Sequence, residues 1–178
     1  MAKSEKQKLK LLYIIQCLME KTDEEHAVTT QEIIDYLALQ GITAERKSIY
    51  TDIDLLIDFG MDIIKKPGRS GGYTLASRQF ELAELKLLVD AVQSSKFITT
   101  KKSRELIGKL ETLCSKYEAT QLHRQVVVTN RNKAVNENIY YNVDIIYNAI
   151  AENVKIQFQY FEWDVSKEMK LRRDGKIY

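Results

Sequence analysis

Two short amphipathic segments, separated by a single glycine, constrain the fold of this chain more than any other feature. Residues 29–32 read Thr-Thr-Gln-Glu, a capping box that satisfies free backbone donors, and the apolar residues after it predict a helix to about residue 40. Gly41 tolerates the positive φ at which a helix ends. Over residues 44–59, helical spacing predicts a second helix with a buried stripe of Ile49, Ile53, Leu56 and Ile57. This arrangement is typical of a helix-turn-helix.

The segments on either side extend this prediction to about residue 78. Residues 4–21 carry an amphipathic pattern that predicts a helix in front of the pair, and Ile42 and Thr43 are expected to act as an apolar plug and an N-cap in the turn. Residues 61–66 and 72–75 are short strand candidates around the turn-rich sequence Pro-Gly-Arg-Ser-Gly, so they predict a hairpin. We therefore expect a winged helix-turn-helix, the wing being the hairpin, over residues 1–78.

The polar face of the helix predicted at 44–59 carries groups that read bases in the major groove. Lys47 donates to guanine or phosphate, and Thr51 offers a hydroxyl and a methyl. Asp54 and Asp58 would repel phosphate, so they are compatible with DNA binding only if the helix enters the groove by its N-terminus. The alternative to DNA contact is that this face is an ordinary solvated face. The candidate DNA contacts are Arg46, Lys47, Ser48, Tyr50 and Thr51 here, Lys65, Lys66, Arg69 and Ser70 in the glycine-rich hairpin, and Thr29 and Thr30 at the preceding helix start.

The net charge and the two cysteines indicate the cellular compartment of the protein but do not by themselves indicate a nucleic-acid partner. The net charge is +2, and residues 1–78 hold 11 basic and 12 acidic side chains, so an electrostatic footprint for DNA must come from local clusters such as the lysines before residue 11. Cys17 and Cys114 lie among apolar residues at helical spacing, which indicates small core residues in a reducing compartment. The sequence shows neither a membrane span nor a signal peptide, so we expect a cytoplasmic protein.

The middle of the chain predicts a helical linker over residues 79–124. Apolar residues recur at helical spacing in residues 80–97 and again in residues 100–117. Two helices alone bury little surface, so the remaining apolar stripes predict a homodimer formed through residues 80–118.

The last third of the chain mixes short elements. Residues 125–129 are a strand candidate, the asparagine-rich residues 130–138 predict a linker, and residues 139–152 predict a helix. Residues 155–160 alternate polar and apolar side chains, which predicts a half-buried strand, and residues 168–173 are placed to return antiparallel to it. The fold class predicted for the whole chain is mainly α with short β.

Catalytic and metal-binding patterns are absent from the sequence. His26 and His123 are far apart and lack an acidic or cysteine partner at ligand spacing, so we expect surface histidines, no metal and no cofactor. We find no phosphate-binding loop and no nucleophile elbow, and we expect that the chain is not an enzyme. A biotin ligase-repressor is disfavoured because residues 79–178 lack the glycine-rich adenylate loop. A winged helix used only for protein contacts stays open as the alternative to DNA binding.

Several stretches resemble bacterial WYL-domain transcriptional regulators. Residues 48–56 read Ser-Ile-Tyr-Thr-Asp-Ile-Asp-Leu-Leu, and the hairpin ends in Gly-Gly-Tyr, as in the winged helix of that family. The family typically reads Arg-Thr-Ile-Tyr-Arg-Asp-Ile in this helix; Lys47 stands here for the first arginine, and Thr51 replaces the second. Residues 140–146 and 156–160 look like the helix and first strand that open a WYL domain.

The resemblance implies that residues 125–178 are the start of a WYL domain, a small Sm-like barrel whose Trp-Tyr-Leu motif lies beyond Tyr178. It implies a sequence-specific regulator of transcription, repressor or activator, that is modulated by a small-molecule or nucleotide-like effector. Arg172 and Arg173 are the candidate anion contacts for that effector.

Overall fold

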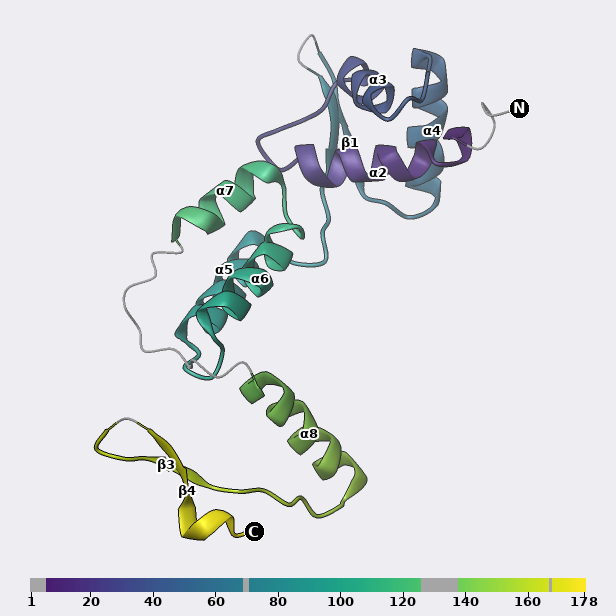
Figure 1. The fold of residues 1–178 in the computed structure, drawn as a ribbon. Helices are drawn as coiled ribbons and strands as arrows, with labels where there is room; N and C mark the ends of the chain where they lie inside the picture. Colours follow the sequence, from purple (N-terminus) through teal and green to yellow (C-terminus); the bar gives the residue numbers. More distant parts are fainter. Residues whose placement is uncertain (1–5, 69–70, 126–137, 167) are drawn as a thin grey trace.

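A computed structural model describes residues 6–68, 71–125, 138–166 and 168–178 of the chain. The protein is mainly helical with two small antiparallel β-hairpins, which agrees with the predicted class (Figure 1). Its elements are α2 (Lys10–Lys21), α3 (Thr30–Leu39), α4 (Arg46–Asp58), β1 (Ile63–Lys66), β2 (Gly72–Leu75), α5 (Leu82–Ser94), α6 (Thr100–Glu111), α7 (Lys116–Gln125), α8 (Asn138–Glu152), β3 (Phe161–Trp163), β4 (Met169–Leu171) and the 3₁₀ turn η1 (Arg172–Gly175).

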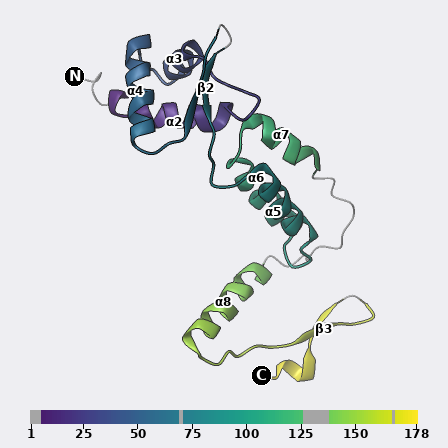
Figure 2. The same cartoon turned by 180° about the vertical axis from the view of Figure 1, so that it is seen from behind.

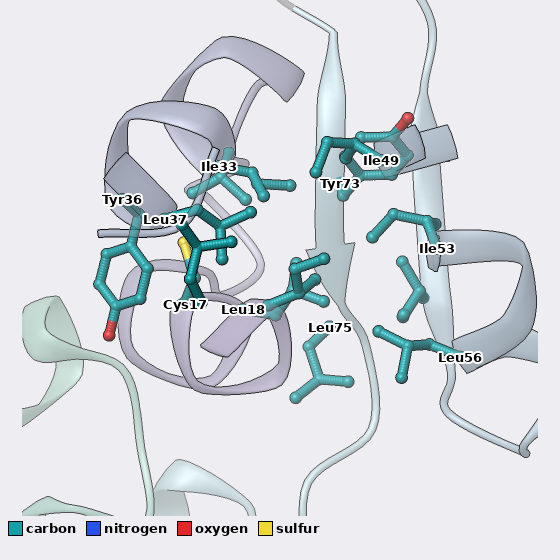
Figure 3. Close-up of a cluster of buried hydrophobic side chains, with 14 residues drawn as sticks. Cys17, Leu18, Ile33, Tyr36, Leu37, Ile49, Ile53, Leu56, Tyr73 and Leu75 are labelled. Atoms are coloured by element: carbon teal, nitrogen blue, oxygen red, sulfur yellow. The ribbon is translucent and has the colours of Figure 1, made fainter. Parts of the chain in front are cut away.

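The first hydrophobic core lies between α2, α3, α4 and the β1–β2 hairpin (Figure 3). Ile49, Ile53 and Leu56 face it as predicted, but Ile57 is 37% exposed. The buried stripe of α4 instead includes Asp52, which lies three residues after Ile49 and four before Leu56. The apolar pattern misplaced the edge of this stripe because the sequence offers no sign that an aspartate is buried.

The turn between α3 and α4 follows the prediction in part. Gly41 has a φ of +73°, and the side chain of Ile42 is buried. Thr43 is not the N-cap, however, since α4 begins at Arg46 after Glu45, which makes no side-chain cap. The Thr43 carbonyl instead accepts a hydrogen bond from the Gln7 side chain.

The first hairpin pairs β1 with β2 in the predicted antiparallel way, with Ile63 opposite Leu75 and Lys66 opposite Gly72. A third backbone segment joins this sheet, because Val28 and Tyr73 exchange two backbone hydrogen bonds of 3.0 and 2.8 Å. Sequence reasoning missed this bridge, since one residue between a loop and a helix shows no strand periodicity.

The second core lies between α5, α6 and α7. The helix predicted over residues 100–117 is in fact two helices, because α6 ends at Glu111 and α7 begins at Lys116. Ser115 caps the start of α7: the Glu118 backbone N–H donates to the Ser115 hydroxyl, and the Ser115 N–H donates to the Glu118 carboxylate. The sequence Ser-Lys-Tyr-Glu is thus a capping box that sequence reasoning overlooked.

Helix α7 also joins the two cores, since it lies beside the end of α2 (Figures 1 and 2). The buried Ser115 hydroxyl donates to Asp23 at 2.6 Å, and the Tyr117 ring stacks on His26 with centroids 3.7 Å apart. Arg78 donates to the backbone carbonyls of Met19 and Thr22. The end of α2 and the loop after it are therefore fixed to the second core by three side chains, those of Arg78, Ser115 and Tyr117.

The last part of the chain contains α8 and the antiparallel pair β3–β4. The return strand was predicted, but residues 155–160 are extended chain outside β3, with one bridge between Gln159 and Ile177. The strand predicted at 125–129 and the linker predicted at 130–138 lie almost wholly outside the described residues. Within the described ranges, no helix has both the length and the apolar character needed to cross a membrane.

Candidate nucleic-acid interface

The first half of α4 presents four of its five predicted contact residues to solvent. Arg46, Lys47, Tyr50 and Thr51 are exposed on it. The Arg46 guanidinium donates to the Gln31 side chain at the start of α3, at 3.4 Å, and the Thr51 hydroxyl donates to the Lys47 carbonyl, at 3.2 Å. Two cations, a phenol and a hydroxyl therefore share one accessible surface at the N-terminal end of a helix.

Ser48, also a predicted contact, is half-buried and turns toward α2. The Lys10 ammonium donates to its hydroxyl at 2.5 Å and forms an ion pair with Asp52 at 2.6 Å. Lys10 belonged to the lysine cluster considered for phosphate contact, but its charge is used to hold α4 against α2. Removing one partner from such a buried pair is costly, so Lys10 and Asp52 fix the position of α4.

An ion pair between Lys65 and Asp54, 2.5 Å apart, links α4 to the hairpin. The hydrogen bond that the Lys65 ammonium donates to the Asp54 carboxylate raises the pKa of Lys65. Because the pair is exposed, it contributes little stability. It does neutralise one of the two aspartates that oppose phosphate, and it leaves Lys65 less available to a ligand. Asp58 lies exposed at the far end of α4.

The remaining predicted contacts divide into three groups. The Lys66 ammonium donates to the Glu24 carbonyl at 3.0 Å. Arg69 and Ser70 lie outside the described residues. Thr29 caps α3 through the predicted capping box, in which the Thr29 N–H and hydroxyl both donate to the Glu32 carboxylate. An acidic group therefore already occupies this helix start. Thr30, the next residue, is half-buried.

Residues considered for other chemistry lie away from this surface. His26 contacts Asp23 and Tyr117, and His123 lies 3.1 Å from Glu111, so both histidines have partners that the sequence did not reveal. Burial raises the pKa of the Cys17 and Cys114 thiols to about 11, as expected for inert core residues. Arg172 and Arg173 are exposed at the turn that follows β4.

Comparison with known families identifies a match within this part of the chain. A profile of the domain described as "FokI, D3 domain" matches residues 12–68, which run from α2 to just past β1. That domain is associated with DNA binding, so the match supports DNA as a partner of this chain. No curated protein and no solved structure matches the chain. These findings give no support to the WYL resemblance, which stays a prediction.

Proposed function

We propose that this chain is a sequence-specific transcriptional regulator that binds double-stranded DNA through a winged helix-turn-helix. The observation that carries the proposal is a coincidence of position: the matched stretch, residues 12–68, contains the exposed half of α4 with Arg46, Lys47, Tyr50 and Thr51. In the proposed complex this half of α4 lies in the major groove, and the β1–β2 hairpin lies along the backbone or minor groove.

The charges along α4 favour entry by its N-terminus. Arg46 and Lys47 lie at that end, and Asp58 lies at the other, where it would repel phosphate inside the groove. Lys47 is suited to guanine or phosphate, and the Thr51 methyl is suited to thymine. Lys66, at the end of β1, adds a cation for the backbone.

The test is selection from a library of genomic DNA fragments, followed by salt titration of the enriched sites. We compare the wild-type chain with the double variant Lys47→Ala/Thr51→Ala and with a control, Lys155→Ala, at an exposed lysine outside the matched stretch. The double variant is expected to lose about 1–3 kcal/mol of discrimination for each base contact removed, and the control none. Affinity is expected to fall as salt rises.

A chain that enriches no sites at low salt contradicts the proposal. It would favour the second candidate, a winged helix used for protein contacts, which one feature supports: Phe59, at the end of α4, is 82% exposed, and Leu55 one turn earlier is also exposed. If the chain captures a protein partner independently of salt, and the Phe59→Ser variant does not, the protein-contact function is supported.

We propose that this regulator is not an enzyme. The apolar stripes of residues 80–118 support the proposal that it works as a homodimer, and the resemblance to WYL regulators adds the proposal that it responds to an effector. For the dimer, the relevant surface is on residues 80–118, where Leu87 and Phe97 are 71% and 72% exposed. Arg172 and Arg173 stay the proposed effector contacts in the WYL segment.

A further inference from the structure

A cavity of about 940 Å³ lies where the first hairpin meets the helical segment. Its wall includes Ile64 and Thr74 from the hairpin, Arg78 from the connection to α5, and Tyr117 from α7, together with the loop after α2. The volume is within the range of small-molecule sites. None of the α4 residues assigned to DNA lines this cavity.

Two residues of this wall have polar atoms without partners. Oγ1 of Thr74 and Nη1 of Arg78 are closed to water and have no hydrogen-bond partner among the described residues. Thr74 is only 3% exposed. The other terminal nitrogen of Arg78 is held by backbone carbonyls, so its side chain is fixed in place. Buried polar groups without partners are rare and costly, and a ligand that accepts hydrogen bonds would satisfy both.

The rest of the wall restricts the chemistry of such a ligand. Its carboxylates outnumber its two permanent cations, Lys66 and Arg78, because Asp23, Glu24, Glu25, Glu81 and Glu118 all line the cavity. This excess repels a polyanion such as a nucleotide and favours a group of positive charge. Ile64, Leu82 and Phe80 add apolar surface.

We propose that this cavity binds a free α-amino acid with an apolar side chain. The carboxylate accepts hydrogen bonds from Arg78 Nη1 and the Thr74 hydroxyl, the ammonium faces the glutamates, and the side chain lies on the apolar wall. Because both polar atoms are closed to water, the proposal requires a local rearrangement that opens them to the carboxylate. An effect on DNA binding, through the hairpin that carries Thr74 and Lys66, rests on the proposed function; binding itself does not.

The experiment measures amino-acid binding to the whole chain without DNA. The twenty L-amino acids are screened singly by thermal shift, and hits are titrated by calorimetry beside two analogues, the matching amine without the carboxylate and the matching acid without the amine. Inorganic phosphate is the anion-only probe. We expect binding by apolar amino acids and affinity at least about tenfold weaker for either analogue, because each lacks one charged contact.

The diagnostic variant is Thr74→Val, which keeps the shape of the side chain and removes only the hydroxyl. It is expected to weaken binding about tenfold while the thermal stability of the free chain is kept or raised, since an unsatisfied buried group is lost. Thr120→Val, at an exposed threonine of α7, is the control and is expected to bind normally.

The proposal is overturned if no amino acid shifts the melting temperature, if phosphate binds better than the amino acids, or if Thr74→Val binds like the control. Selection of DNA sites is scored separately, so failure of this site and failure of the DNA-binding proposal give different results.

Discussion

At the scale of single residues, Asp23 has the densest set of contacts at the junction of the two cores. One carboxylate oxygen accepts from the backbone N–H groups of Glu25 and His26 and lies 2.6 Å from the His26 ring, and the other accepts from Ser115. Burial alone would raise the pKa of this carboxyl, but the hydrogen bonds from Ser115 and His26 outweigh it and hold the pKa below the ordinary value of 3.8.

This pKa makes stability dependent on pH in the acid range. A carboxyl whose folded pKa is depressed stabilises the fold above its unfolded pKa, and that stability is lost as pH falls through the folded pKa. We therefore expect the free energy of unfolding to decrease as the pH is lowered from 3.8. In Asp23→Asn, stability at pH 7 is expected to be lower and the acid dependence shallower. Urea unfolding at pH 7 and pH 3 measures both, with exposed Asp58→Asn as control; equal acid dependence in wild type and Asp23→Asn would contradict the assignment.

At the scale of elements, the approach of Val28 to the hairpin requires a glycine. A Cβ added at Gly72 would lie 2.3 Å from the Val28 carbonyl oxygen, whereas one added at Gly108, in α6, meets nothing within 4 Å. Gly72→Ala is therefore expected to destabilise the protein by about 1–3 kcal/mol through overpacking. Gly108→Ala is expected to stabilise it by about 0.5–1 kcal/mol, because glycine is unfavourable inside a helix. Denaturant midpoints compare the two; equal shifts would show that Val28 and Gly72 are not in close contact.

The elements that sequence alone predicted are those encoded by local patterns. The α3 capping box, the turn at Gly41 and the hairpin each depend on residues within a few positions of one another, and the structure has all three. The misses depend on distant partners: Asp52 is buried because Lys10 reaches it, and Ser115 is buried because it meets Asp23. The local helical pattern likewise predicted the polar, exposed face of α4, whereas the pairing of Lys65 with Asp54 and of Ser48 with Lys10 depends on distant residues and was not predicted.

At the scale of the whole molecule, the α5–α7 core leaves large apolar side chains uncovered. Leu87 on α5 and Phe97 after it are mostly exposed, although α7 covers more of this segment than the sequence suggested. We expect these residues to pack against a second copy, so that sedimentation finds a dimer at tens of micromolar. Leu87→Asp/Phe97→Asp is expected to be monomeric, and Leu39→Asp, at an exposed leucine of α3, to stay dimeric. A monomeric wild type would refute this interface.

The bonds that join the start of the N-terminal unit to its end determine when that unit is complete during synthesis. The Leu75 backbone N–H donates to the Thr22 hydroxyl, and Arg78 donates to carbonyls at the end of α2. A nascent chain that ends before β2 has all three helices but not the strand that covers them, so its apolar face stays open to chaperones and to other chains. We therefore expect α4 to be held in its final position only after the residues around Arg78 have left the ribosome.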